Sequence, residues 1–334
     1  MMANITVIGA GAFGTAISLS LLNGGHRVTL WCRNLDKAEK LINTRENDRL
    51  LGVKIPPEIE ITADRSSFEN CDVAVMAVPS YAIADTIKLL KNKKNGIIVS
   101  LAKGFDPATL SRLSTVMEKS VTVPVAVLSG PSHAEEIARK IPTSLVAAGK
   151  DINISKTIAQ IFSTPYLRVY TSNDLCGVEL GGALKNVIAV CSGICDGLNL
   201  GDNSRAALIT RGLCEMARLG EKMGAQKATF SGLSGMGDLI VTCSSKYSRN
   251  RRFGTLIASG ESVENALIQV GTVEGYHAAK YTYMLAKKHG VDMPICNECY
   301  QILYNGKLPK DAVGELMLRP LKDESEPLLM ETKL

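Results

Sequence analysis

The sequence predicts an α/β N-terminal domain built on a doubly wound, mostly parallel sheet, followed by an all-α C-terminal domain. A β-branched stretch at residues 5–8 leads into Gly9-Ala10-Gly11-Ala12-Phe13-Gly14, which opens an apolar helical stretch at residues 15–22. Strand and helix patterns then alternate as far as about residue 171. From Asp174 onward, helix-forming residues dominate and strand patterns disappear.

The glycine-rich stretch has the G-x-G-x-x-G pattern inside a strand–turn–helix–strand unit of about 30 residues, which is typical of Rossmann dinucleotide-binding domains. Gly9 permits the tight turn, Gly11 lets backbone N–H groups approach a pyrophosphate, and Gly14 lets helix and strand pack closely. Two alternatives are a glycine-rich turn of another α/β protein and membrane insertion of the uncharged residues 3–25. Five glycines within that segment and no basic residues before it argue against insertion.

The remaining elements follow from short apolar runs and their flanking residues. Six further strands are predicted at residues 28–31, 72–78, 96–101, 124–129, 144–148 and 167–170, with a short extended segment after Pro56-Pro57. Residues 37–51 are charged and helix-prone, and residues 83–90 are predicted to form a crossover helix. Ser132 and Glu135 have the spacing of a capping box, which predicts that a helix starts there.

Length and composition indicate a two-domain protein of ordinary apolar content. We place the domains at residues 1–173 and 174–334, the second ending in a loose, charge-rich tail at residues 320–334. The net charge of +5 suits small anionic ligands and does not by itself indicate nucleic acid. Nine cysteines without framework spacing or a secretion signal indicate reduced thiols and a cytoplasmic location, with no integral membrane segment. Cys296 and Cys299 lack a second ligand pair, so no metal site is predicted.

The residue after the second strand bears on cofactor choice. An NAD-specific Rossmann site usually places Asp or Glu here, where the carboxylate binds the ribose 2′-OH. This chain has Cys32 and Arg33, and an arginine pairs with the 2′-phosphate of NADP. The sequence therefore predicts NADP as the cofactor, or tolerance of both NADP and NAD. The alternative interpretation of Arg33 is an exposed turn residue.

Two lysines, Lys103 and Lys185, are candidate functional residues because of their positions in the predicted fold. Lys103 follows the strand at residues 96–101, at the edge where open α/β sheets bind ligands, although a solvated loop lysine is the alternative. Lys185 is, with Glu179, the only charge between residues 175 and 195, in a helix with small residues around the lysine. Desolvation lowers a lysine pKa toward the range useful for proton transfer. The alternative is a lysine that extends its amine to water.

A basic cluster follows a predicted glycine-rich loop, residues 232–238. Lys246, Arg249, Arg251 and Arg252 lie within seven residues, around Ser248 and Asn250. Arginine binds phosphate through a bidentate fork. A nucleic-acid patch is the alternative, but aromatic residues are few and the cluster is short, so a small phosphate ligand is favoured.

These motifs together resemble the soluble NAD(P)-dependent glycerol-3-phosphate dehydrogenases over nearly the full length of the chain. The shared stretches, in order, are VIGAGAFGTA, LAKG, LSGPSHAEE, ELGGALKNVIA, GMGDLIVTC, SRNRRFG and VEGY. Ala12-Phe13 departs from the Ser-Trp of many members, but the glycines are intact. The resemblance implies a Rossmann domain, an all-helical domain and an active site between them. It also implies reversible hydride transfer between NAD(P)H and glycerone phosphate, giving sn-glycerol 3-phosphate for phospholipid synthesis.

The resemblance also implies roles for individual residues. Lys185 is the implied proton donor and acceptor at the C2 oxygen, with Asp238 orienting it. The implied substrate-binding residues are Lys103, Gly130, Ser132, Lys185, Asp238, Ser248, Arg249 and Asn250. The implied cofactor-binding residues are Gly9, Gly11, Ala12, Phe13, Gly14, Arg33, Lys103, Ala134, Arg249, Val273 and Glu274. Asn186 and Thr242 lie in or beside the same motifs and are expected to support the site.

Two other functions share part of this pattern. A two-domain dehydrogenase of a β-hydroxy acid, or of its acyl thioester, has the glycine fingerprint and a helical second domain, but lacks LKN combined with SRNRR. A dinucleotide-sensing binding protein needs no buried lysine. The sequence sets neither the physiological direction nor feedback by the product, and it is compatible with a homodimer.

Overall fold

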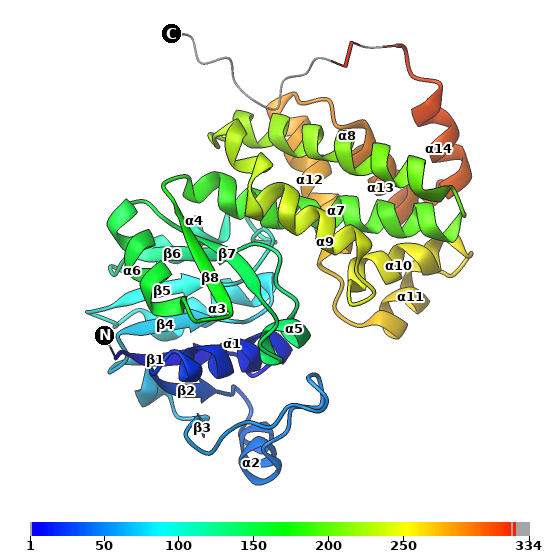
Figure 1. Cartoon of the computed structure of the whole chain (residues 1–334). Helices are drawn as coiled ribbons and strands as arrows, with labels where there is room; N and C mark the ends of the chain where they lie inside the picture. The colour runs from blue at the N-terminus through cyan, green and yellow to red at the C-terminus, as the bar shows by residue number, and fades with distance from the viewer. Residues whose placement is uncertain (1, 322, 325–334) are drawn as a thin grey trace. The chain divides into compact units, whose positions relative to one another are not determined.

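The computed structural model describes residues 2–321, 323 and 324, and divides into two compact units (Figure 1). The first unit is residues 1–175 and the second is residues 176–334. The tail predicted to be loose, residues 320–334, lies outside the described residues apart from residues 320, 321, 323 and 324.

The first unit is built on one eight-stranded sheet with the order β3-β2-β1-β4-β5-β6-β7-β8 (Figure 1). The strands are β1 Asn4–Ile8, β2 Arg27–Trp31, β3 Glu60–Thr62, β4 Val73–Met76, β5 Ile97–Ser100, β6 Val125–Ser129, β7 Thr143–Gly149 and β8 Leu167–Ser172. Strands β1 to β6 are parallel, β7 runs antiparallel to β6, and β8 is parallel to β7. The predicted mostly parallel, doubly wound sheet is therefore confirmed. The strand order reverses beside β1, where such sheets bind nucleotides.

Side chains of the central strands alternate between two cores, one on each face of the sheet. Ile5 and Val7 of β1 belong to one buried cluster, whereas Ile8 belongs to the other. This period of two explains why the strand sequences are almost uniformly apolar, because both faces are covered. The covering helices are α1 Ala12–Asn23, α2 Leu35–Thr44, α3 Ile83–Ile87, α4 Leu113–Glu118, α5 Ala134–Ala138 and α6 Ile152–Phe162.

Two helix predictions in this unit were too long. The helix-prone residues 37–51 form only α2, which ends where Arg45 adopts a left-handed conformation. The segment after α2 packs against the glycine turn and the start of α1 instead of continuing the helix. The Asn47 side-chain amide donates to Thr15 Oγ1 at 2.7 Å and approaches the Ala10 and Gly11 carbonyls. Residues 83–90 divide into α3 and a 3₁₀ turn, Lys88–Leu90.

The second unit is helical over the residues that the structure describes. Its helices are α7 Leu175–Gly197, α8 Gly201–Lys222, α9 Asp238–Ser244, α10 Arg249–Ala258, α11 Val263–Val270, α12 Glu274–His289, α13 Pro294–Asn305 and α14 Pro309–Met317. A 3₁₀ turn, Lys227–Ser231, and a π turn, Leu233–Gly237, precede α9. The glycine-rich residues 232–238 are therefore largely helical, and their prediction as a loop is wrong.

Helix α7 is the core of the second unit. It is long and apolar enough to cross a membrane by length and composition, yet 94% of its most apolar window is buried inside the protein, as in a core helix. Its glycines let neighbouring backbones approach. A Cβ on Gly193 would lie 1.9 Å from the Arg251 carbonyl oxygen, and a Cβ on Gly181 would lie 2.6 Å from that of Ser234. Larger residues at these positions would push α10 and the π turn away from α7.

Candidate active site

The three glycines of the turn after β1 have two different roles: two of them shape the turn, and the third borders open space. Gly9 has φ +119°, and a Cβ there would lie 2.5 Å from the Ala77 carbonyl oxygen. A Cβ on Gly14 would lie 1.9 Å from the Gly9 carbonyl oxygen, so both glycines are needed to build the turn. Gly11, at the start of α1, has nothing within 4 Å of an added Cβ. The turn therefore leaves room at Gly11 for a ligand phosphate at the positive end of a helix dipole.

The end of β2 presents cationic groups beside this turn. Arg33 is exposed and precedes Asn34, whose side chain accepts a hydrogen bond from the Lys37 N–H and caps α2. Lys37 Nζ reaches back to donate to the Ala10 carbonyl at 2.6 Å. Burial lowers the pKa of Lys37, and Arg49 acts in the same direction. The sequence did not predict that Lys37 contacts the glycine turn. A lysine in an amphipathic helix gives no sign of a contact with a residue 27 positions earlier.

Lys103, Gly130 and Ser132 come together at the carboxyl ends of β5 and β6. Lys103 Nζ donates to the Gly130 carbonyl at 2.9 Å and lies 3.4 Å from Ser132 Oγ. The predicted capping box at Ser132 and Glu135 is wrong. His133 is the residue before α5, no side chain caps that helix, and Ser132 Oγ donates instead to the Gly130 carbonyl. The short turn draws the serine toward the lysine rather than toward the helix. Ala134 begins α5 and is buried.

Lys185 lies in the middle of α7 and is 5% exposed. Its Nζ donates to Asp238 Oδ1 at 2.6 Å and to Thr242 Oγ1 at 2.5 Å. Asp238 and Thr242 stand one turn apart on α9, and the Thr242 hydroxyl donates to the Asp238 backbone carbonyl. The prediction that Asp238 orients the lysine matches this geometry. The alternative, a lysine extended into water, does not, because both members of the ion pair are buried.

Three of the four cations of the basic cluster, Arg249, Arg251 and Arg252, lie in the first turn of α10, and Lys246 precedes the helix. Ser248 precedes the helix, and its hydroxyl accepts a hydrogen bond from the Arg251 N–H at 3.2 Å. Arg249 and Arg252 are exposed, whereas Arg251 Nε donates to Asp196 Oδ2 at 2.5 Å and so ties α10 to the end of α7. The four cations of the cluster therefore do not act alike. Arg251 has a structural partner, and Arg249 is presented at the N-terminal end of a helix.

Asn250 is buried and does not point its side chain away from the protein. Its Oδ1 accepts from the Gly275 N–H at 2.9 Å, and its Nδ2 donates to Asn186 Oδ1 at 2.9 Å. The residue beside the catalytic candidate Lys185 is thus joined to α10 and to the start of α12, where Val273 and Glu274 lie. Sequence reasoning placed these residues in one site, but gave no sign of this chain of amides.

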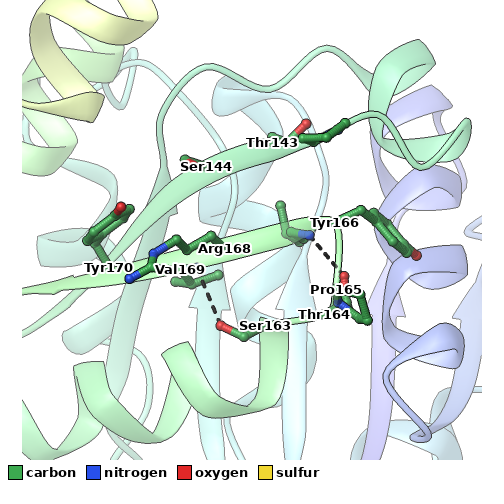
Figure 2. A pocket seen from close by; sticks show the side chains of 11 residues that line it. Thr143, Ser144, Ser163, Thr164, Pro165, Tyr166, Arg168, Val169 and Tyr170 are labelled. Atoms are coloured by element: carbon green, nitrogen blue, oxygen red, sulfur yellow. Dashed lines mark hydrogen bonds between the residues drawn. The ribbon is translucent and has the colours of Figure 1, made fainter.

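A cavity lies elsewhere, at the β8 edge of the sheet. Its volume is about 630 Å³, and residues 142–144 and 163–170 line it. Figure 2 shows the side chains of these residues. Hydroxyls of Ser163 and Thr164 accept the N–H groups of Val169 and Leu167. These contacts cover part of a sheet edge. None of the sequence-predicted site residues lines this hollow. Across the described residues, no group of three or more His, Cys, Asp or Glu is arranged to hold a metal ion.

The fold and these clusters define a class. A parallel sheet whose order reverses beside a glycine turn, with space for phosphate at Gly11, is that of an NAD(P)-binding domain. This domain is followed by a helical unit that holds a buried lysine paired with an aspartate. The combination is typical of a two-domain NAD(P)-dependent oxidoreductase. Residues 4–155 match the family model described as the NAD-dependent glycerol-3-phosphate dehydrogenase N-terminus, and residues 174–314 match that of its C-terminus. The chain belongs to this family.

Individual relatives agree with the family models. A protein of Thermoanaerobacter sp. named glycerol-3-phosphate dehydrogenase [NAD(P)+] is 48% identical over 96% of this chain and 98% of its own length. One of the same name from Moorella thermoacetica is 47% identical over 98% of this chain and 99% of its own. The crystal structure of glycerol-3-phosphate dehydrogenase from Coxiella burnetii superposes with a TM-score of 0.90 at 36% identity, covering 94% of this chain and 98% of that one.

Proposed function

We propose that this chain catalyses reversible hydride transfer between NAD(P)H and glycerone phosphate, which gives sn-glycerol 3-phosphate for phospholipid synthesis. The observation that carries the proposal is the buried Lys185–Asp238–Thr242 cluster in a chain of this family. Reduction of a ketone leaves negative charge on its oxygen, and a positive proton donor beside that oxygen stabilises the charge. Lys185 is that donor, and its two partners hold Nζ in place.

The first unit fits a dinucleotide. The open space at Gly11 accepts a pyrophosphate, and Gly9 and Gly14 build the turn that presents the N–H groups of Ala12 and Phe13. The cofactor supplies or accepts the hydride when bound. Arg33 pairs with the 2′-phosphate when the cofactor is NADP. The other residues that we assign to the cofactor by family resemblance are Lys103, Ala134, Arg249, Val273 and Glu274.

The substrate phosphate is assigned to the start of α10. Arg249 offers a guanidinium fork there, and the first N–H groups of a helix have no partner within it. Ser248 caps the same turn. Binding energy from this phosphate, which does not react, orients the ketone toward Lys185. Lys103, Gly130, Ser132, Asp238 and Asn250 complete the substrate residues proposed by resemblance.

The direct test is oxidation of NADPH and of NADH by glycerone phosphate, followed by the loss of reduced-nicotinamide absorbance. A β-hydroxy acid and an acyl-thioester substrate serve as comparison substrates. Turnover restricted to the comparison substrates, or cofactor binding without turnover, would contradict the proposal. We also propose a cytoplasmic location, supported by nine free thiols, seven of them buried. A homodimer is compatible with this function, and sedimentation of the purified chain decides it.

Arg249→Ala tests the phosphate assignment. We expect a strong rise in KM for glycerone phosphate and a lower kcat, because remote binding energy orients the ketone. Dihydroxyacetone, which has no phosphate, should be a poor substrate that is nearly indifferent to Arg249→Ala. Arg252→Ala, an exposed arginine on the same helix, is the matched control. Equal losses with both substrates would show that Arg249 is not the phosphate anchor.

A further inference from the structure

A lysine from the second helix of the first unit bonds the backbone of the glycine turn. Lys37 Nζ donates to the Ala10 carbonyl oxygen at 2.6 Å. The backbone of Lys37 is fixed at the start of α2, because its N–H donates to the Asn34 side chain at 3.0 Å. The Lys37 side chain therefore extends from a capped first turn of α2 and ends on the turn that precedes α1.

The same turn has a second, neutral contact with the segment after α2. Asn47 is buried, and its Nδ2 donates to Thr15 Oγ1 at 2.7 Å and lies 3.3 Å from the Ala10 carbonyl oxygen. Its Oδ1 accepts the N–H of Arg49 at 3.1 Å. Asn47 thus already ties this segment to the turn and to α1. What Lys37 adds to the arrangement is a positive charge.

That charge has little compensation within the protein. Burial has the largest effect on the pKa of Lys37 and lowers it, and Arg49 acts in the same direction. Two groups act in the opposite direction. The first is the Cys32 thiol, whose own pKa is raised by burial, and the second and weaker is Asp48, whose carboxylate binds Lys40 Nζ at 2.6 Å. A partly buried ammonium group that bonds a neutral carbonyl, near a second cation, is a favourable neighbour for an anion.

The Ala10 carbonyl belongs to the same peptide group as the Gly11 N–H. A hydrogen bond from an ammonium group to a peptide oxygen polarises the peptide and strengthens its N–H as a donor. Gly11 borders the open space in which the proposed function places the cofactor pyrophosphate, at the N-terminal end of α1. The contact of Lys37 with Ala10 therefore bears on the backbone that meets this pyrophosphate.

We propose that Lys37 is a further cofactor-binding residue, which supplies positive charge to the pyrophosphate through the Ala10–Gly11 peptide. This inference rests on the cofactor placement in the proposed function. NADPH and NADH have the same pyrophosphate, so Lys37 strengthens the binding of both. Arg33, by contrast, is assigned to the 2′-phosphate that only NADPH carries. Lys37 thus sets affinity for the dinucleotide, and Arg33 selects between its two forms.

Titration of the purified, cofactor-free chain with NADPH and with NADH, followed by nicotinamide fluorescence, tests this role without measuring turnover. Lys37→Gln removes the charge but keeps an amide donor for the Ala10 carbonyl. We expect roughly tenfold weaker binding of both cofactors and an unchanged melting temperature of the cofactor-free protein. Lys37→Arg keeps a cation, so both affinities should stay within about threefold of the parent. Lys156→Gln, at an exposed lysine on α6 of the same unit, is the matched control.

Each contrary result overturns the inference in a recognisable way. Unchanged affinity for both cofactors in Lys37→Gln would make the lysine a purely structural tie. A loss confined to NADPH would make it a second contact of the 2′-phosphate. Equal losses in Lys37→Gln and Lys37→Arg would show that the shape of the contact matters and the charge does not. Lys37→Met is a second neutral variant, and failure of both neutral variants to fold would also make the lysine structural.

These outcomes are separable from the fate of the proposed reaction. A parent that binds both cofactors but does not reduce glycerone phosphate would contradict the proposed substrate and leave the role of Lys37 intact. A parent that reduces glycerone phosphate, together with a Lys37→Gln variant of parental cofactor affinity, would overturn the role of Lys37 alone. The two failures are therefore distinguishable.

Discussion

The candidate ligand-binding groups are backbone groups in the first unit and buried side chains in the second. In the first unit, Gly9 and Gly14 shape the turn, because neighbouring backbone leaves no room for a Cβ at either position. Gly11 borders open space, where backbone groups can meet a ligand. In the second unit the candidate groups are buried side chains, such as Lys185, that are held by partners on other helices. A backbone cluster is local in sequence, whereas a side-chain cluster depends on how distant segments pack.

This difference predicts how each unit responds to change. A backbone cluster tolerates surface substitutions and fails when a side chain enters the space kept for the ligand. A buried, paired charge is coupled to its partner, so that removing one member leaves the other uncompensated. Substitutions in the second unit should therefore affect both chemistry and stability, and those at Gly11 should affect ligand binding alone.

The largest expected effect is that of Lys185→Ala. Loss of the proton donor should lower turnover of glycerone phosphate by roughly 10²-fold or more, while NADPH affinity changes little. The uncompensated Asp238 should also lower the free energy of unfolding by about 3–5 kcal/mol. Steady-state rates, cofactor titration and urea denaturation measure the three quantities. Asp238→Asn is the companion variant, because it keeps the shape but removes the carboxylate. A variant with near-parental turnover would show that another group supplies the proton.

Gly11→Val should act on binding without unfolding the first unit. Apart from Gly11 and its chain neighbours, no protein atom lies within 4 Å of an added Cβ, so the fold has room for it. The side chain would instead occupy space that a pyrophosphate needs. We expect cofactor affinity to fall by roughly 100-fold, about 3 kcal/mol, with an unchanged melting temperature. Gly14→Ala is the contrast, because its Cβ would collide with the Gly9 carbonyl and destabilise the turn. Normal cofactor affinity in a folded Gly11→Val variant would contradict the assignment of the glycine turn as the dinucleotide-binding site.

The same contrast explains what could be predicted from the sequence. The strands of the first unit and the glycine turn were found because a period of two and a contiguous motif are local signals. The Lys185 partners Asp238 and Thr242 lie 53 and 57 residues away, and only the family resemblance placed them together. The end of α2 and the Ser132 contact were mispredicted because tertiary contacts of Asn47 and Lys103 override the local pattern.

The Asn250 side chain shows the limit of both approaches. Resemblance assigns the residue to the substrate, and composition identifies a polar group beside two arginines. Neither shows that its amide is already bonded at both ends, to Asn186 and to the Gly275 N–H. Hydrogen-bond partners of a buried amide depend on helix packing, which no periodicity encodes.

Arg33→Ala is expected to give a smaller effect, confined to one cofactor. An exposed arginine that pairs with the 2′-phosphate should strengthen NADPH binding by roughly 1–3 kcal/mol and leave NADH binding almost unchanged. Comparison of kcat/KM for both cofactors measures this difference. Arg27→Ala, an exposed arginine at the start of β2, is the matched control. Equal losses for NADPH and NADH would show that Arg33 does not bind the 2′-phosphate.

The smallest expected effect on activity concerns Glu215, whose contribution is to stability. It is a buried carboxyl on α8 that accepts hydrogen bonds from the N–H groups of Ile295 and Cys296 at the start of α13. Burial raises the pKa of Glu215 from 4.5 to about 7, despite these two donors. Between these values the folded protein keeps a proton that the unfolded chain has released. The free energy of unfolding should therefore fall as pH rises from about 5 to 7, by at most about 1.4 kcal/mol per pH unit, and level off above that.

Glu215→Gln isolates this contribution. Glutamine cannot titrate, so the variant should lose that part of the pH slope. It should also be less stable at every pH, because its NH₂ group faces a backbone N–H and leaves that donor without an acceptor. Urea denaturation at several pH values measures the slope in both proteins, and Glu221→Gln, exposed on the same helix, should retain the parental slope. Identical slopes in parent and Glu215→Gln would mean that the carboxyl is ionised when folded. The two N–H donors of α13 would then outweigh the effect of burial on this carboxyl.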